Sequence, residues 1–308
     1  MHESFVISQH IKAAINHNEP LVALESSVIA QGLPEGANIK AATQMQEAVR
    51  ENGAVPAMIG IIDGIVKVGL TENEIAQLAS GTAAKVGVGS MPYAIMKKLC
   101  GGTTVSSTVR IASAVGINVV ATGGIGGVHR GYAEVLDISE DLWELVKAPV
   151  TLVSSGIKSV LDIAATIEWL ETHSLPIYGY QTKELPAFYS ASSGISIPSI
   201  ASDEEYASLA TICRAEMGFV GAILVAVPVP EEYSIDVEPQ IQQAIDEART
   251  QNIYGKALTP YLLRRISELT SGKTIDTNLA LLRNNCAVAA RLAKAAVGQT
   301  GRKCGFSV

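Results

Sequence analysis

The sequence predicts an α/β protein with three layers, α/β/α, around a largely parallel central sheet. Apolar runs of strand length alternate with helix-like segments along the 308 residues, which is typical of a parallel sheet covered on both faces. The composition, 48% hydrophobic but 5% aromatic with 27 glycines, suits a core of small aliphatic residues and tight turns. No repeat, low-complexity tract or linker interrupts the pattern, so we expect residues 1–308 to form a single domain.

The first part of the chain predicts strands and helices in alternation. In order these are a strand at 20–27, an amphipathic helix at 37–53, two short strands at 55–70 and a helix at 71–80. Gly53 ends the first helix. Asp63 and Gly64 form a hairpin-type turn between the two short strands. Thr71, followed three residues later by Glu74, is the capping box that opens the second helix.

The rest of the chain continues the alternation and then becomes mostly helical. Strands are expected within 117–127, 149–156, 176–180 and 219–230, and helices at 239–250, 259–270 and 277–297. Ligands of such sheets bind beyond the carboxyl ends of the strands. The loops that follow 21–24, 118–121 and 150–153 are therefore the expected positions of a site.

Charge and cysteine usage indicate where the protein acts and what it does not bind. The net charge of −7 and the absence of a Lys/Arg cluster argue against nucleic acid or an anionic membrane as a partner. Cys100, Cys213, Cys286 and Cys304 form no CxxC pair, which favours a reducing compartment. The first twenty residues do not resemble a signal peptide, and no apolar stretch reaches about 18 residues. We expect a cytoplasmic protein.

A glycine-rich loop, residues 122–131, follows the strand at 118–121. Glycines let a backbone approach a ligand and present N–H groups to an anion. The loop is not a dinucleotide fingerprint, because His129 stands where that motif requires glycine, and no GK[ST] follows. It is either a flexible connection or a cradle for a phosphate, sugar or carbonyl, with Thr122 at its entrance and His129 at its exit.

An acidic segment follows the glycine loop. Asp137, Ser139, Glu140 and Asp141 place three carboxylates and a hydroxyl within five residues. Such oxygen ligands suit a hard divalent cation such as Mg²⁺ or Mn²⁺. The same pattern also describes an ordinary helix start, with Ser139 as N-cap and acidic residues in the first turn.

Lys158 lies just after the turn at 154–156, where a helix-like pattern is expected to begin. A helix N-terminus disfavours a cation, and a partly desolvated amine there is a nucleophile able to form a Schiff base. The alternative is an exposed lysine. Glu25, at the end of an apolar strand, is a candidate general acid. Lys85 lies among small apolar residues, where a cation needs a partner.

Eight segments together resemble the pseudouridine-5′-phosphate glycosidase family, also called indigoidine synthase A-like. They are ALESSVIAQGLP (23–34), AKVG followed by Pro92 (84–92), GGTTVSSTV (101–109), ATGGIGGVHRG (121–131), DISEDLWEL (137–145), SSGIKSVLDI (154–163), PIYGYQTKELPAFY (176–189) and TNLALLRNN (277–285). The resemblance implies an α/β/α homotrimer that uses Mn²⁺. It also implies reversible cleavage of the C–C glycosidic bond of pseudouridine 5′-phosphate, which gives uracil and ribose 5-phosphate.

The resemblance also implies roles for individual residues. Lys158 matches the lysine that forms a covalent sugar adduct, Glu25 the proton donor, and Asp137 the metal-associated aspartate. The matching substrate contacts are Lys85, Val105, Thr122, His129, Ser139, Glu140, Asp141, Asn278 and Asn285. A carbon–carbon bond offers no leaving heteroatom to protonate, so a lysine iminium that accepts electrons suits this chemistry better than a pair of carboxylates.

Three basic positions of the family pattern are changed in this sequence. No cation follows Lys85 within 86–92, the arginine expected after the PAFY motif is absent from 190–194, and Asp276 stands where lysine is common. Basic side chains usually bind phosphate dianions. An alternative hypothesis is therefore a substrate without the phosphate, or another C-ribosyl aglycone. Two further hypotheses are a non-catalytic nucleotide- or sugar-binding protein and a metal-dependent hydrolase.

Overall fold

The computed structural model describes residues 4–297, except for the side chains of 134, 135 and 256. The strands of the main sheet are β1 (Phe5–Ile7), β2 (Leu21–Leu24), β3 (Val55–Ile62), β4 (Ile65–Val68), β5 (Ala84–Val86), β6 (Gly101–Thr103), β7 (Val119–Ala121), β9 (Thr151–Ser154), β11 (Ile177–Tyr180), β12 (Ser199–Ile200) and β13 (Ile223–Ala226). Nine of them follow the order β1-β4-β3-β2-β7-β9-β13-β11-β12, and β6 pairs with β3 and β5. Most neighbouring pairs are parallel; β3 is antiparallel to β4 and β6.

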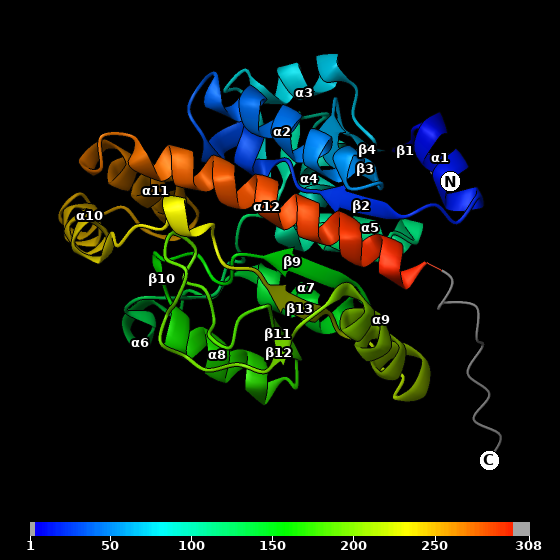
Figure 1. Cartoon of the computed structure of the whole chain (residues 1–308). Coiled ribbons are helices and arrows are strands. Elements are labelled where there is room, and N and C mark those ends of the chain that lie inside the picture. The colour runs from blue at the N-terminus through cyan, green and yellow to red at the C-terminus, as the bar shows by residue number, and fades with distance from the viewer. Residues whose placement is uncertain (1–3, 298–308) are drawn as a thin grey trace.

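Helices cover both faces of this sheet, which confirms the predicted three layers (Figure 1). The helices are α1 (Gln9–Asn16), α2 (Ala37–Glu51), α3 (Glu72–Ala79), α4 (Met91–Met96), α5 (Val105–Val115), α6 (Tyr132–Val135), α7 (Glu140–Lys147), α8 (Ile163–Thr172), α9 (Asp203–Thr211), α10 (Glu238–Thr250), α11 (Leu258–Leu269) and α12 (Lys273–Ala296). Helix α12 lies in front of the sheet in Figure 1, against α2 and α9, while α5 and α7 lie behind it.

The central strands are buried from end to end, because helices lie on both sides of them. Every residue of β2, β7, β9 and β13 is buried. This explains why these strands read as continuous apolar runs and do not alternate with polar residues. The strand predicted within 219–230 is confirmed, but β13 covers four residues of that segment.

Two predicted local features are confirmed: the turn at Asp63 and Gly64 and the helix cap at Thr71. Asp63 and Gly64 both have positive φ, 50° and 77°, as the tight turn between β3 and β4 requires. Thr71 caps α3, and the Glu74 side chain accepts a hydrogen bond from the Thr71 backbone N–H at 2.8 Å. Both features depend on residues within four positions of each other, so the sequence alone specifies them.

The prediction that a helix begins around Lys158 was wrong. Helix α8 begins five residues later, at Ile163, and Asp162 is its N-cap. The intervening Leu161 and Asp162 form strand β10 (Leu161–Asp162), which pairs with β8 (Val128–His129) of the glycine loop. Lys158 therefore lies in a loop held by a tertiary contact, and the argument from the helix dipole does not apply to it.

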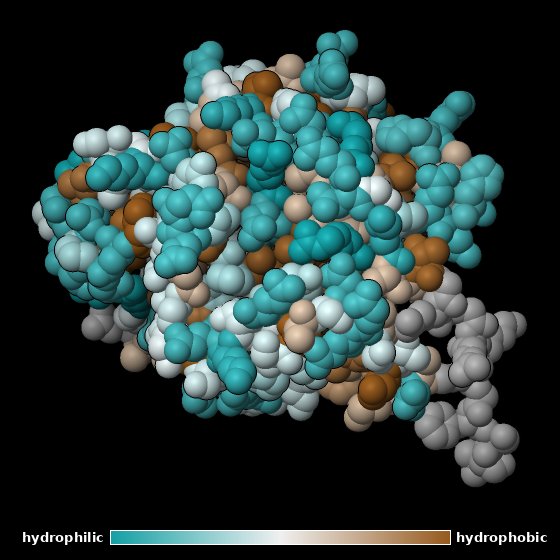
Figure 2. Space-filling view, viewed as in Figure 1, coloured by the Kyte–Doolittle hydropathy of each residue, from teal (hydrophilic) through white to brown (hydrophobic). Residues whose placement is uncertain are grey.

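Within residues 4–297, none of the helices is both long and apolar enough to cross a membrane. The face shown in Figure 2 is mainly hydrophilic, with scattered hydrophobic residues. Cys100, Cys213 and Cys286 are free thiols. Cys304 lies outside the described residues.

Candidate active site

One cleft lies beyond the carboxyl ends of β2, β7 and β9. It has two arms, which share Ser27, Gln31, Lys85, Lys158 and Thr259 as a common centre. The predicted residues that line the cleft are Glu25, Lys85, His129, Asp137, Ser139, Glu140, Asp141, Lys158 and Asn278. Loops far apart in the sequence thus bring nine of the twelve predicted site residues to one place, at the edge of the sheet where a ligand is expected.

Glu25 is the first residue after β2, and it is only 3% exposed. The hydroxyl of Ser27 donates a hydrogen bond to its Oε2 at 2.7 Å, and the hydroxyl of Thr122 donates to its Oε1. Each carboxylate oxygen has a fixed donor, so the side chain is held in one orientation at the wall of the cleft. Thr122 itself is fully buried and lies behind Glu25.

Asn285 of α12 is fully buried and ties two of the cleft loops together. Its Nδ2 donates to the carbonyl oxygens of Thr122 at 2.8 Å and Gly123 at 3.3 Å. Its Oδ1 accepts a hydrogen bond from the Ser155 hydroxyl at 3.2 Å. These contacts make Asn285 a positioning residue for the loops after β7 and β9. It lies behind the cleft wall, like the buried Val105 at the start of α5.

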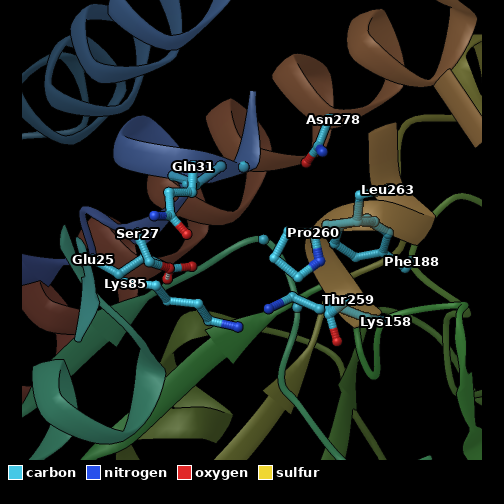
Figure 3. A pocket seen from close by; sticks show the side chains of 14 residues that line it. Glu25, Ser27, Gln31, Lys85, Lys158, Phe188, Thr259, Pro260, Leu263 and Asn278 are labelled. Carbon is cyan, nitrogen blue, oxygen red and sulfur yellow. Dashed lines mark hydrogen bonds between the residues drawn. The ribbon is translucent and has the colours of Figure 1, made fainter. Parts of the chain in front are cut away.

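Lys158 is half-buried, and Figure 3 shows its side chain reaching into the cleft. Its backbone N–H donates to the carbonyl of Ile125 at 3.1 Å, and the N–H of Ile125 donates to the carbonyl of Gly156 at 3.0 Å. Ile125 and Ile157 form a parallel bridge. The glycine loop and the Lys158 loop therefore hold each other by the same pattern of hydrogen bonds as two parallel strands.

Lys85 extends from β5 toward the same point, so two amines face the centre of the cleft (Figure 3). Burial lowers the pKa of Lys85 below its ordinary value, and the positive charge of Lys158 lowers it further. The nearby carboxylates of Asp141, Glu25 and Glu140 act in the opposite direction. These carboxylates act on Lys85 through space, and they favour its charged form.

The glycine loop is packed against protein groups. A Cβ on Gly126 would lie 2.2 Å from Ser139 Oγ, and one on Gly127 would lie 2.4 Å from Thr166 Oγ1. Asp141 accepts hydrogen bonds from the N–H groups of Gly126 at 2.9 Å and Ser106 at 2.8 Å. These close approaches require glycine. The loop is an ordered wall of the cleft and not a flexible connection.

The acidic segment contains a helix cap. Ser139 is the N-cap of α7, and its hydroxyl accepts the Asp141 N–H at 3.2 Å, as the helix-start interpretation predicts. Glu140 Oε2 accepts the N–H of Gly89 at 3.0 Å. A Cβ on Gly87 would lie 1.4 Å from Glu140 Oε1, so that glycine makes room for the carboxylate.

Asp137 and His129 face each other in one arm of the cleft, with 3.8 Å between Oδ2 and Nδ1. Burial lowers the pKa of His129, the Asp137 carboxylate raises it, and the charges of Lys85 and Lys158 lower it. Residues 4–297 contain no group of three or more His, Cys, Asp or Glu placed to hold a metal. The donors present fit a hard cation that keeps most of its water ligands.

Comparison with known proteins places this site in a family. Residues 10–295 match the family model described as indigoidine synthase A like protein. The chain belongs to the indigoidine synthase A-like family. The pseudouridine-5′-phosphate glycosidase of Caldanaerobacter subterraneus subsp. tengcongensis is 44% identical, over 93% of this chain and 95% of the relative. The enzyme of the same name from Myxococcus xanthus is 46% identical, over 94% and 97%.

Two solved structures of similar proteins share the indigoidine synthase A-like fold. The prealnumycin C-glycosynthase AlnA, in complex with ribulose 5-phosphate, superposes with a TM-score of 0.89 at 34% identity, over 98% of this chain and all of AlnA. An indigoidine synthase A-like protein from Thermotoga maritima superposes with a TM-score of 0.87 at 37% identity, over 95% and 97%.

Sequence reasoning missed part of this indigoidine synthase A-like cleft. The missed lining residues include Ser27, Gln31, Phe188, Thr259, Pro260 and Leu263. Ser27, Gln31 and Phe188 lie inside segments that carry the family resemblance and could have been found there. Phe188 also adopts a positive φ of 65°, which is unusual for an aromatic residue, and its N–H donates to Ser155 O at 3.0 Å. The three residues of α11 carry no comparable signal.

Proposed function

We propose that this chain reversibly cleaves the C–C glycosidic bond of pseudouridine 5′-phosphate, giving uracil and ribose 5-phosphate through a Schiff base on Lys158. One observation carries the proposal: Lys158 and Glu25, from loops more than a hundred residues apart, line the same arm of one cleft. The names of the relatives support the reaction, and the ribulose 5-phosphate in AlnA supports a phosphorylated five-carbon sugar as ligand.

The first half of the reaction prepares C1′ for cleavage. The C1′–O4′ bond of the ribose breaks, and the neutral amine of Lys158 adds to C1′ while the base is still attached there. O4′ takes up the proton that the amine nitrogen loses, so that a free hydroxyl and a neutral secondary amine result. Glu25, held by Ser27 and Thr122, then delivers a proton to C5 of the base. The buried position of Glu25 excludes competing proton donors from bulk water.

The second half releases both products. The C1′–C5 bond breaks, its electron pair restores the C5=C6 double bond whose electrons took up the delivered proton, and the nitrogen lone pair of Lys158 forms the C1′ iminium. One water adds to the iminium, the C–N bond breaks, and ribose 5-phosphate leaves with the free amine restored. The overall reaction consumes one water, so excess uracil and sugar phosphate drive it backward.

Asp137, with His129 beside it, is the residue we propose to hold a divalent cation such as Mn²⁺. When bound, the cation would supply positive charge and ordered waters to the sugar. The chain's own contribution is to keep Asp137 facing the cleft: its backbone carbonyl accepts the His129 N–H at 3.0 Å. A homotrimer and a cytoplasmic location belong to the same proposal.

The comparisons do not favour a substrate without the phosphate. The relatives are named for a 5′-phosphate, and the AlnA structure contains a sugar phosphate. Although three basic positions of the family pattern are changed, Lys85 in the common centre is a cation that can bind the phosphate group. Retention of Lys158, Glu25 and Asp137 in the cleft also argues against a binding protein without activity.

The proposal is tested by borohydride reduction in the presence of ribose 5-phosphate, followed by mass spectrometry of the digested protein. We expect the mass of a reduced five-carbon sugar phosphate on the peptide that contains Lys158. Lys85 is the built-in control, because it is an amine in the same cleft. An adduct on Lys85 alone, or on neither lysine, would contradict the proposal and favour the hydrolase or the binding protein.

A further inference from the structure

The two arms of the cleft differ in chemistry. Beyond the common centre, one arm is lined by Val28, Phe188, Pro260, Leu263, Asn278 and Glu25, and we call it the apolar arm. The other is lined by residues such as Thr104, His129, Asp137, Ser139 and Glu140, and we call it the polar arm. A ribose phosphate carries hydroxyls and charge, whereas a nucleobase is planar and mostly apolar on its faces. The hydroxyls of the sugar therefore suit the hydrogen-bonding groups of the polar arm, the phosphate suits the lysines of the common centre, and the base suits the apolar arm.

The position of Glu25 supports the same orientation. In the proposed reaction Glu25 protonates the base, and Glu25 lines the apolar arm. Lys158 belongs to the common centre, where C1′ must lie for the amine to reach it. A base in the apolar arm and a sugar in the polar arm place the scissile bond between these two residues.

Gln31 is a residue of the common centre whose hydrogen-bonding direction is fixed. Its Nε2 donates to the carbonyl of Ala83 at 3.0 Å. The other end of the amide, Oε1, is turned toward the interior of the cleft (Figure 3). Gln31 lies on the π-helical turn η1 (Val28–Gly32), and such turns often mark functional sites. With Nε2 engaged by Ala83, the oxygen is the end of the amide that faces the cleft, and it can accept a hydrogen bond there.

We infer that Gln31 Oε1 accepts an N–H from the edge of the aglycone, so that the apolar arm selects a planar heterocycle with N–H beside C=O over a carbocyclic aromatic ring. The inference rests on the proposed function, whose aglycone it specifies. Asn278 enters the arm from α12 on the other side, and an amide there can both donate and accept (Figure 3). Phe188 and Leu263 provide apolar contact area for the faces of the ring.

An oriented polar group gives selectivity that the apolar walls cannot. Apolar pockets discriminate poorly between flat rings of similar size, whereas a site built to hydrogen-bond its ligand rejects the analogue without the partner group. A ring without an N–H would leave Gln31 Oε1 facing it without a donor. Uracil has two N–H groups on its edge, and 1,3-dimethyluracil has none, so this pair of compounds tests the point.

The experiment compares Gln31→Leu with Gln46→Leu. Gln46 is a matched control because its Nε2 also donates to a backbone carbonyl, that of Ala42, but on α2 and outside the cleft. Uracil binding is measured by calorimetry, and the KM for uracil is measured in the direction of synthesis. We expect Gln31→Leu to weaken uracil binding by about 5- to 10-fold, the effect of one lost hydrogen bond. Gln46→Leu should leave it unchanged.

Two further readouts separate the inference from the proposed function. Binding of 1,3-dimethyluracil should be weak and equal in the wild-type and Gln31→Leu proteins. The borohydride-trapped adduct with ribose 5-phosphate alone should form in both. Unchanged uracil affinity, or a loss of adduct in place of a loss of uracil binding, would overturn the inference. If the wild-type protein forms no adduct, the proposed function fails, and weaker uracil binding by Gln31→Leu would still support an aglycone site.

Discussion

The two sides of the cleft are built differently. The side that carries Glu25 and Lys158 consists of loops at the edge of the sheet, which Asn285 joins by buried hydrogen bonds. The opposite side consists of the hairpin of α10 and α11, whose strong polar contacts are largely internal, such as Arg265 with Glu247. The hairpin reaches the glycine loop through Arg130 and Glu238, where the Glu238 side chain is 58% exposed.

The residues proposed for the chemistry therefore lie on one side of the cleft, and the other side mainly forms a wall. The groups that we propose to meet the reacting atoms lie on backbone with buried hydrogen bonds, which hold them in the geometry that a reaction needs. The hairpin supplies Thr259, Pro260 and Leu263 as a wall, and its ion pair with the glycine loop is partly exposed, a kind of contact that contributes little to stability. We expect substitutions on the sheet side to change rate or stability strongly, and substitutions of the hairpin's polar surface contacts to have small effects.

The largest effect is expected from Lys158→Ala. Turnover should fall to background, because the proposed covalent adduct at C1′ forms on this amine. The thermal unfolding midpoint should stay close to wild type, since a half-buried loop side chain is removed without a change in the core. Uracil release and a thermal melt measure the two quantities, with Lys40→Ala, exposed on α2, as the control. Residual turnover at a tenth of wild type would argue against covalent catalysis.

Glu25→Gln should lower turnover by about 10²–10⁴-fold, the usual contribution of a general acid. Glutamine keeps the size of the side chain and one oxygen acceptor, so the loop should keep its shape. Adduct formation with ribose 5-phosphate alone needs no protonation of a base and should persist. Loss of the adduct together with turnover would show that Glu25 acts on the sugar and not on the aglycone.

Asn285→Ala should lower the free energy of unfolding by about 1–3 kcal/mol, because it leaves buried carbonyls without their donor. Turnover should also fall, since the loops that carry Thr122 and Ser155 lose their connection. Urea denaturation measures the first effect. Asn284→Ala is the control, one residue earlier on α12, where the side chain donates to Pro228 O at 3.2 Å in a less buried position. Equal destabilisation by both would contradict the positioning role.

The smallest effect is expected from Glu247→Gln, which breaks the ion pair inside the hairpin. Hydrogen bonds from Arg265 lower the pKa of Glu247 to about 2. A lowered pKa in the folded protein stabilises it above the unfolded value of 4.5, and this contribution disappears as the pH falls toward 2. The difference in unfolding midpoint between wild type and variant should be small at pH 7 and close to zero near pH 2. A difference that grows on acidification would contradict this assignment.

Prediction from the sequence also succeeded mainly on the sheet side of the cleft and failed mainly on the side of the hairpin. The β2, β7 and β9 strands and the Ser139 cap depend on local patterns, and the rule that ligands bind at the carboxyl edge indicated the loops of the site. The resemblance to the family completed the set of nine cleft residues, and Asn278 came from it alone. The helix expected at Lys158 failed because Leu161 pairs with His129, a contact across about thirty residues that periodicity does not reveal. Thr259 and Leu263 were missed because an ordinary amphipathic helix gives no sign of what its exposed turn covers.

The ladder between β7 and β9 does not stop where the strands end. It continues through Thr122 with Val153, Gly123 with Ser155 and Ile125 with Gly156, and its last rung is the N–H of Lys158 itself. The proposed nucleophile thus stands on an extension of the sheet, and hydrogen bonds hold its backbone in place. Arrival of the substrate has only the lysine side chain left to immobilise, at roughly 1.5–2 kcal/mol.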